Sequence, residues 1–404
     1  MSTENMSKTK VWSIIAIGCL VGMLAFGPRS IFGFFMVPMT DANGWSREGF
    51  AFAIAIQNLV WGIAQPFVGM VADKYGTART LIFGVVFYVV GLLIMSQTTD
   101  ITTLTLSAGV LVGIGVASSA FFLIIAAFAR LLPERYHGIA FGLGTASGSA
   151  GQFLFSPIGN AFLEQYGYVI TLYFLAACVA FVPLLVYPLR GKPEIKTEDG
   201  RADQTIREAI VEAFSHRSYR LLTFGFFVCG YHVAFITVHM PSYIVDLGLD
   251  LSLARWSIGI IGLFNIFGAI LAGTLMMRMP KRYILSFIYV GRAVIITIFV
   301  LTPISSLSVI IFSAGMGVLW LSTVPPTQGL VKVMFGTRYM SMLFGFVFFS
   351  HQVGSFLGIW LGGKIFDATG SYDLMWWSSV VAGLAAAAVH WPIKEVPQGR
   401  YAVG

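Results

Sequence analysis

Charged residues are scarce in this sequence. Asp, Glu, Lys and Arg make up only 11% of the 404 residues, whereas hydrophobic residues make up 57%. Soluble globular domains carry roughly 25% charged residues. A water-soluble fold cannot bury so much apolar surface, so the composition excludes a soluble globular protein and predicts a membrane protein. The net charge of +7 is spread over short loops, so we expect no nucleic-acid partner.

Cysteine is also rare, with three residues in the sequence. Cys19, Cys178 and Cys229 all lie in apolar runs, and none belongs to a CxxC pair. We therefore expect neither a disulfide framework nor a zinc site, and no other metal or cofactor. The sequence also lacks GxSxG and HExxH motifs and paired carboxylates, which argues against a membrane-embedded enzyme.

Long hydrophobic runs dominate instead. The N-terminal MSTENMSKTK precedes an apolar run that is too long for the core of a cleaved signal peptide, so we expect a retained first span. Apolar stretches of about 18 residues or more qualify as membrane helices. They predict twelve spans near 11–38, 50–72, 80–97, 101–130, 138–165, 169–189, 219–245, 254–278, 283–302, 305–333, 339–366 and 374–395.

Positive charges indicate the orientation. With a cytoplasmic N-terminus, 20 of the 25 Lys and Arg residues fall in cytoplasmic segments, and only Arg47, Arg255 and Lys364 lie outside. Cytoplasmic loops of membrane proteins carry an excess of Lys and Arg. We therefore expect both termini in the cytoplasm, most simply across a bacterial inner membrane. The remaining two, Arg29 and Arg292, fall inside helices.

One long polar segment separates the sixth span from the seventh. It predicts a linker, 190–218, between an N-terminal half, 1–189, and a C-terminal half, 219–404. Within it, apolar residues recur at helical spacing opposite charged ones, which predicts an amphipathic helix on the cytoplasmic membrane surface or, alternatively, a partner-binding helix. The apolar side comprises Ile206, Ile210, Ala213 and Phe214, and the charged side comprises Arg207, Glu208 and Glu212.

The two halves repeat one another at an offset of 203 residues. Self-similarity at a fixed offset indicates a structural repeat. We therefore predict an all-α membrane fold of two parallel six-helix repeats, an arrangement known from major facilitator transporters. The matches include Arg135-Tyr136 with Arg338-Tyr339, Phe141-Gly142 with Phe344-Gly345, Gly151 with Gly354, Gly159 with Gly362, and Gly167 with Gly370.

The loop after the second span makes this resemblance specific. Gly69, Asp73, Lys74, Gly76 and Arg79 stand at the spacing G-x-x-x-D-[RK]-x-G-x-x-R, and on this motif the sequence resembles the major facilitator superfamily. The glycines permit a tight turn and close helix approach. Asp73 can sit at a neighbouring helix N-terminus, and Arg79 can pair across the loop. The resemblance implies a transporter that alternates access around a midplane substrate site, with this loop as a gating motif.

Three segments further resemble the monocarboxylate transporter and oxalate–formate antiporter branch. In that branch, the residue after the first-helix proline is a Lys or Arg associated with carboxylate recognition, which here is Arg29. Animal members carry an Asp and an Arg on the eighth helix, where this chain offers only Asn265, so a proton mechanism built on that pair is not implied. The segments are Gly27-Pro28-Arg29-Ser30, Gly230-Tyr231-His232 and Ser350-His351-Gln352-Val353-Gly354.

Two arginines lie deep in the membrane without a carboxylate at that depth. All 18 acidic residues fall in loops or at helix ends, and each Arg at bilayer depth costs about 2.5–3.5 kcal/mol on insertion scales. A guanidinium can grip a carboxylate through two hydrogen bonds. We expect Arg29 either to attract an anionic substrate or to tie to carbonyls or the region of Asp41. Arg292 is expected to point toward the eighth or eleventh span, as a substrate contact or a helix brace.

Histidines and small polar residues could complete such a site. His232 stands at the place of Arg29 in the second half, and His351 lies in the eleventh span. Imidazole can donate to a carboxylate or take up a proton, so both are candidates for substrate binding and proton coupling; packing is the alternative role. Further candidate substrate contacts are Ser119, Ser322, Gln152 and Asn265, although Ser often bonds to its own helix backbone.

These features predict a secondary active transporter for a small organic anion, a short-chain mono- or dicarboxylate, acting as an exchanger or proton symporter. The expected partners are that anion, a proton or counter-anion, and the lipid bilayer, with a monomeric transport unit. An exporter of an unrelated small molecule or drug is one alternative. A transporter-fold sensor that does not cycle is another, but it would be expected to carry a sizeable soluble signalling domain.

Overall fold

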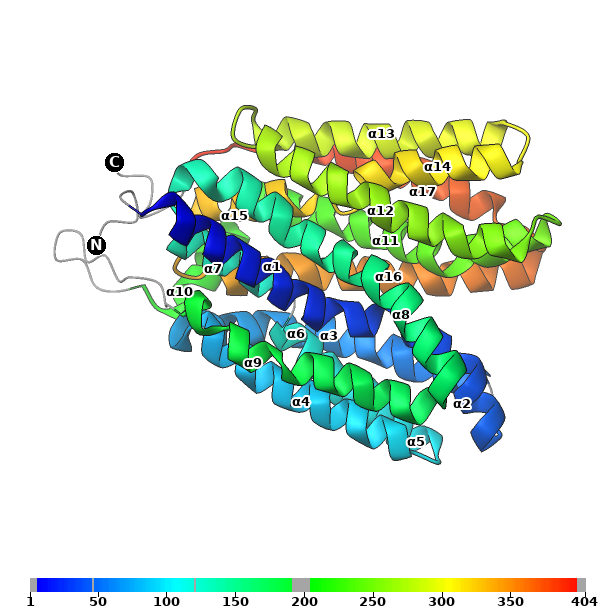
Figure 1. Cartoon of the computed structure of the whole chain (residues 1–404). Helices are drawn as coiled ribbons and strands as arrows, with labels where there is room; N and C mark the ends of the chain where they lie inside the picture. Colours follow the sequence, from blue (N-terminus) through cyan, green and yellow to red (C-terminus); the bar gives the residue numbers. More distant parts are fainter. Residues whose placement is uncertain (1–5, 46, 120, 191–203, 398–404) are drawn as a thin grey trace, which may run out of the picture. The chain divides into compact units, whose positions relative to one another are not determined.

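The computed structural model of the chain is helical, and the residues that it describes contain no strand (Figure 1). Helices therefore satisfy the backbone hydrogen bonds within each segment, as the membrane interior requires. The structure describes residues 6–45, 47–119, 121–190 and 204–397.

The chain divides into two compact units. The border falls inside the predicted linker, of which 191–203 lies outside the described residues, so the predicted bounds of the halves stay a prediction. A short piece near the start of the eleventh span groups with the first unit. The units are Met1–Lys196 with Thr337–Gly345, and Thr197–Gly336 with Phe346–Gly404.

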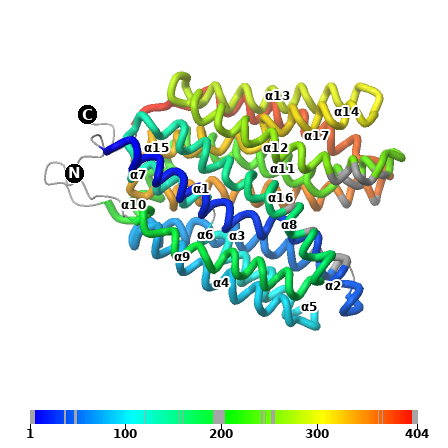
Figure 2. Tube along the Cα trace, viewed as in Figure 1, coloured from blue at the N-terminus to red at the C-terminus, as the bar shows by residue number. Residues whose placement is uncertain are grey.

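In the first unit α1 runs along α8, as Figures 1 and 2 both show. Their contact is close because a Cβ atom on Gly151 would lie 2.7 Å from the carbonyl oxygen of Met23. Small residues allow such backbone approach between membrane helices. The elements are α1 (Lys8–Ser30), η2 (Phe32–Phe35), α2 (Met36–Asn43), α3 (Arg47–Tyr75), α4 (Thr77–Gln97), α5 (Ile101–Leu104), the π-helix η3 (Thr105–Leu111), α6 (Val112–Ser119), α7 (Phe121–Leu131), η4 (Glu134–Tyr136), α8 (His137–Ala180), α9 (Val182–Leu185) and η5 (Tyr187–Leu189).

In the second unit α13 packs against α17 and α14, and α12 packs against α14. The matching glycine, Gly354, again allows close approach, because a Cβ atom there would collide with the carbonyl of Phe227 on α11. The elements are α10 (Ile206–Ser215), α11 (Arg217–Asp246), α12 (Leu251–Leu275), α13 (Lys281–Leu301), α14 (Ser306–Leu319), α15 (Val324–Phe335), α16 (Met340–Thr369) and α17 (Asp373–His390).

The helix α8 contains two predicted spans. Its 44 residues would extend about 66 Å at 1.5 Å per residue, twice the thickness of a bilayer core of about 30 Å. It bends at Gly167, which has φ 76°. Gly370, the matching residue of the second half, ends α16 with φ 70°. Glycine adopts this left-handed backbone without steric cost.

Ten helical segments of the described chain are long and apolar enough to cross a membrane. The first part of α8 and α17 lie at the other two predicted spans, 138–165 and 374–395. Each of the twelve predicted spans thus has a helix. The first, Lys8–Phe35, begins and ends three residues before the predicted 11–38 and comprises α1 and η2.

The tenth span is interrupted, which the hydropathy pattern does not reveal. In this span α14 ends at Leu319 and α15 begins at Val324. In the tenth span, two prolines follow directly in the first turn of α15, where their missing N–H groups do no harm.

The predicted amphipathic segment contains α10. A capping box between Thr205 and Glu208 starts this helix, and Ala209 and Ala213 are buried. Phe214 packs edge-on against Tyr219 of α11 at 5.3 Å between ring centroids. The position of α10 on a membrane surface stays a prediction.

Candidate functional site

Arg29 is held along one side of its guanidinium by two neutral amides of α3. Its Nε donates to Gln57 Oε1 at 3.1 Å, and its Nη2 donates to Asn58 Oδ1 at 2.5 Å. The third nitrogen, Nη1, makes no hydrogen bond to the described residues. Arg29 is partly exposed, and its Nη1 can donate to a further acceptor. An arginine in this state can bind a carboxylate.

Aromatic rings flank the same guanidinium. The Arg29 Cζ lies 4.7 Å from the ring centroid of Trp61 and 5.8 Å from that of Phe26. Cation–π contacts partly replace hydration of a buried cation. Within the described chain Arg29 forms no ion pair, neither with Asp41 nor with any other carboxylate. No carboxylate of the described chain therefore compensates its positive charge.

Arg292 has a different environment and is fully buried. Its Nε and Nη2 donate to the carbonyl oxygen of Leu319 at 3.1 and 2.8 Å, and Nη2 also donates to the carbonyl of Trp320. These carbonyls end α14, where the helix dipole favours a cation. Arg292 also contacts the Cys229 thiol at 3.5 Å. The expectation that it points toward the eighth or eleventh span is wrong: it points to the tenth and seventh, because the interruption leaves carbonyls without helical donors.

Asn265 and Ser322 lie at the same interruption. The Asn265 Oδ1 accepts a hydrogen bond from the backbone N–H of Leu321 at 2.8 Å, and Ser322 Oγ donates to the carbonyl of Val318 at 2.5 Å. Backbone that leaves the helix inside a membrane must find such partners. The structure thus brings Arg292, Asn265 and Ser322 together around the break between α14 and α15, where they bind protein backbone.

The two candidate histidines lie in separate surroundings. His232 is fully buried, and its Nε2 lies 2.8 Å from the carbonyl oxygen of Ser379 on α17, so this nitrogen carries the donated proton. His351 is 7% exposed and lies between the rings of Phe226 and Phe348, with centroids 5.1 and 5.2 Å away. Its Nδ1 is 3.2 Å from Gln352 Oε1. His351 therefore has side-chain partners, whereas His232 binds backbone.

The remaining small candidates do not converge. Ser119 is buried and donates to the carbonyl of Gly115 at 2.7 Å, within its own helix. Gln152 on α8 is partly exposed and makes no hydrogen bond to the described residues. Serine hydroxyls in membrane helices commonly bond one turn back. Ser119 and Ser322 follow this pattern at equivalent positions of the repeat.

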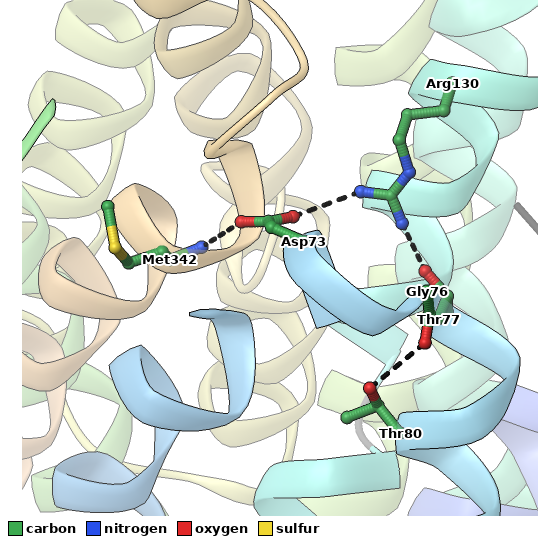
Figure 3. Close-up of polar contacts among 6 residues, drawn as sticks. All are labelled: Asp73, Gly76, Thr77, Thr80, Arg130 and Met342. Carbon is green, nitrogen blue, oxygen red and sulfur yellow. Dashed lines mark hydrogen bonds and ion pairs between the residues drawn. The ribbon is translucent and has the colours of Figure 1, made fainter. Parts of the chain in front are cut away.

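The loop motif forms a buried ion pair (Figure 3). Asp73 Oδ1 lies 3.2 Å from Arg130 Nη1, with both side chains almost fully buried, and Arg130 also donates to the Thr77 hydroxyl. The other carboxylate oxygen, Oδ2, accepts from the backbone N–H of Met342 at 2.9 Å. Met342 lies in the first turn of α16, so Asp73 occupies a helix N-terminus as the sequence suggested.

The glycines of the motif allow this geometry. A Cβ atom on Gly69 would lie 2.5 Å from the backbone of Ser341, and Gly76 has φ 95° between α3 and α4. Gly76 also accepts, through its carbonyl, a hydrogen bond from the Thr80 hydroxyl at 3.1 Å (Figure 3). Lys74 and Arg79 are exposed. Within the described chain Arg79 forms no ion pair, so its expected partner across the loop is not found.

One functional neighbour, Arg130, was not singled out as a site residue from the sequence. Arg130 lies in the last turn of α7 and is the partner of Asp73. Gln57 and Asn58 hold Arg29. A cation near the end of an apolar helix would have signalled Arg130, because a buried carboxylate needs a positive partner. No sequence signal shows which of many polar residues faces Arg29.

Comparison with known proteins identifies the family of this chain. A family model described as Major Facilitator Superfamily matches residues 18–359. The chain belongs to the major facilitator superfamily. This superfamily member is therefore a multi-pass integral membrane transporter and not an enzyme, and the predicted fold of twelve helices in two repeats is confirmed.

Individual relatives and solved structures are similar to this chain over most of its length. It is 29% identical over 362 residues to an uncharacterized MFS-type transporter, YcxA, of Bacillus subtilis, covering 88% of each chain. It is 24% identical to monocarboxylate transporter 13 of Rattus norvegicus, over 92% of this chain and 85% of that one. The fucose:proton symporter FucP of E. coli has a TM-score of 0.73 at 14% identity, covering 93% of this chain and 97% of that one. The proton:xylose symporter XylE has a TM-score of 0.74 at 15% identity, covering 96% and 97%.

Proposed function

We propose that this major facilitator transporter carries a short-chain organic monocarboxylate, with Arg29 as the cationic substrate contact. One observation carries the proposal: Arg29 is partly exposed, and within the described chain its guanidinium has no carboxylate partner and its Nη1 has no hydrogen-bond acceptor. A charge held in this way in a membrane protein is a functional group by default. An anion is the ligand that would neutralise it.

The second deep arginine supports a single negative charge on the substrate. Two of the three Arg292 nitrogens bind backbone carbonyls, and the side chain is fully buried. A dicarboxylate would need a second cationic contact, and Arg292 is already engaged. This favours a monocarboxylate over the dicarboxylate that the sequence left equally open. The similarity to a protein named monocarboxylate transporter 13 is consistent with this choice.

Coupling to protons is the second part of the proposal. Both structural neighbours, FucP and XylE, are proton symporters by name. His351 is the better proton-accepting candidate, because its partners are the side chains of Gln352 and Ser355, whereas His232 is closed in between α11 and α17. Exchange of one anion for another is the alternative. We further propose a bacterial inner-membrane location, cytoplasmic termini and a monomeric transport unit.

The Asp73 network serves as the gating motif in this proposal. Asp73 joins α3 to Arg130 of α7 and to the first turn of α16 through groups that have no other partners of opposite charge nearby. Such a buried pair holds firmly while it is closed, because separating it leaves an uncompensated charge. Alternating access would break and remake it in each cycle.

Uptake into proteoliposomes tests the proposed function. Purified protein would be given radiolabelled lactate, pyruvate, formate and oxalate, with xylose as a neutral comparison, with and without an inward proton gradient. We expect uptake of at least one monocarboxylate above that of oxalate, and no uptake of xylose. Stimulation by the gradient indicates symport, and stimulation by internal unlabelled anion indicates exchange. Transport of xylose without any carboxylate would refute the anion proposal.

A further inference from the structure

Gln57 lies between Arg29 and the backbone of the fourth span. Its Oε1 accepts the hydrogen bond from Arg29 Nε at 3.1 Å, and its Nε2 donates to the carbonyl oxygen of Ala108 at 2.6 Å. The side chain is 1% exposed. Because a guanidinium only donates and a carbonyl only accepts, the two partners fix which end of the amide faces which. Gln57 therefore has a single orientation that satisfies both.

The anchor of Gln57 is an irregular piece of helix. Ala108 belongs to η3, a π-helical segment, and π-helical turns interrupt the regular backbone hydrogen bonding and occur frequently at functional sites. The segment η3 also approaches α3 closely, since a Cβ atom on Gly109 would lie 3.0 Å from the carbonyl oxygen of Ala53. Gln57 is thus fixed to closely packed backbone on the side away from Arg29.

Asn58 completes the support with a second neutral amide. Its Oδ1 accepts from Arg29 Nη2, while its Nδ2 donates to the carbonyl of Ile54 at 3.0 Å within α3. Both supports fill the same side of the guanidinium and leave the Nη1 side open. Neither support carries charge. A carboxylate in either place would lie against the guanidinium and cancel its attraction for an anion.

We propose that Gln57 is the positioning residue that aims the open side of Arg29 at the substrate and, because it is neutral, keeps the guanidinium charge available for an anion. This inference rests on the proposed function and names how the same site selects anions. Both polar atoms of the Gln57 side chain already bind protein groups and the side chain is buried, so it acts through the guanidinium. The π-helical carbonyl of Ala108 sets its orientation.

The substitution Gln57→Glu tests this directly. A protonated carboxyl has the shape of the amide, accepts from Arg29 and donates to Ala108. An ionised carboxylate loses the donor to Ala108 and neutralises Arg29. An ordinary glutamate ionises at about pH 4.3, but burial disfavours the charged form, and position 57 is 1% exposed. The introduced carboxyl should therefore ionise between pH 5.5 and pH 8, so uptake of lactate, or of the first anion transported in the panel above, should worsen with pH. We expect KM about 10-fold above that of wild type at pH 8 and within about 2-fold at pH 5.5, with a smaller change in maximal rate.

Two variants control the experiment. Gln57→Met removes both hydrogen bonds without adding a titratable group, so its KM relative to wild type should be raised equally at both pH values. Gln97→Glu adds a carboxylate at an exposed position at the end of α4, where the amide contacts Tyr173, and should match wild type at both. The inference is overturned if Gln57→Glu keeps the wild-type KM at pH 8, or if Gln57→Met shows the same pH dependence.

The surroundings leave few other titratable groups to produce this pattern. Tyr88 of α4 interacts electrostatically with Arg29, and an ordinary tyrosine titrates near pH 10, roughly two units above the range tested. The segment η3 has the sequence TLSAGVL and no charged residue. The described part of α3 near Gln57 likewise contributes only uncharged side chains. The introduced carboxyl is therefore the group that responds to pH.

A readout without substrate separates the two ideas. Infrared spectra of purified Gln57→Glu protein would be titrated in the wild-type background and in the Arg29→Gln background. We expect an ionised carboxyl at pH 7 when Arg29 is present and a protonated one when it is absent. Identical titrations would overturn the inference. A difference between the backgrounds, in a protein that moves no carboxylate, would refute the proposed function alone.

Discussion

The two membrane-buried arginines have opposite environments. Arg29 is supported by neutral side chains on one side, lies beside aromatic rings and remains partly exposed. Arg292 is fully buried and donates to the carbonyls that end α14. Depth alone therefore does not distinguish a binding arginine from a bracing one. What distinguishes them is whether protein acceptors already use the donors and whether one side stays open.

The comparison extends to a third arginine. Arg130 is also buried, but it has a carboxylate partner, Asp73. Three arginines thus meet three kinds of acceptor: amides, backbone carbonyls and a carboxylate. Only the last cancels the charge. Of the other two, Arg292 is fully buried and donates to the carbonyls that end α14. Arg29 is partly exposed and binds neutral amides, so of the three arginines it is the one best placed to bind an anion.

The largest effect is expected for Arg29→Gln. Removing the charge should lower uptake of the preferred anion by about 30-fold or more, as for a charge-assisted contact worth roughly 2–5 kcal/mol. The protein should still elute as a monodisperse species with unchanged thermal stability, because Gln57 and Asn58 can bond to each other or to water. Arg29→Lys is the matched control and should retain part of the uptake. Normal uptake by Arg29→Gln would remove the distinction between the two arginines.

An intermediate effect is expected for Arg292→Leu, and on stability instead of selectivity. The substitution leaves the carbonyls of Leu319 and Trp320 without their donors, and each buried unsatisfied group costs about 1–3 kcal/mol. The apparent melting temperature in detergent should fall by several degrees, while KM of the protein that remains folded changes little. If Arg292→Leu kept its melting temperature and lost affinity for the anion, Arg292 would be a substrate contact.

The smallest effects are expected for Ser119→Ala and Ser322→Ala. These serines occupy equivalent positions of the repeat and donate to their own helix backbone. Loss of such a bond should change stability by less than about 1 kcal/mol, and we expect KM within about 3-fold of wild type for either. A larger loss of affinity from one alone would show that the halves differ here as well as at the arginines.

The sequence predicts the membrane helices well because hydropathy and positive charge act over whole segments. The twelve spans were accessible in this way, whereas the superfamily and the position of Asp73 at a helix N-terminus followed from the repeat and the loop motif. Pro325 and Pro326 lie next to the interruption of the tenth span, but the apolar run continues through it, so hydropathy predicts one unbroken helix. A hydropathy window averages over such a break because the residues on both sides are apolar.

The partners of buried polar groups were the part that sequence did not predict. Arg292 turns toward the tenth span because that span breaks, and Arg29 meets Gln57 and Asn58 because α1 and α3 pack at one particular rotation. Both depend on tertiary packing at the level of single side chains. Many polar residues lie at suitable depth, and periodicity gives the face of a helix without naming the neighbour.

The contact between Asp73 and α16 has an asymmetry that bears on how the sequence can vary. The acceptor is a side chain, but the donor is the main-chain N–H of Met342, which every residue except proline possesses. Nearly any substitution at position 342 leaves the donor in place, whereas a change of Asp73 to a shorter or apolar residue removes the acceptor. The hydrogen bond therefore does not constrain which side chain stands at position 342. Of the two partners, only the carboxylate of Asp73 depends on the identity of its side chain.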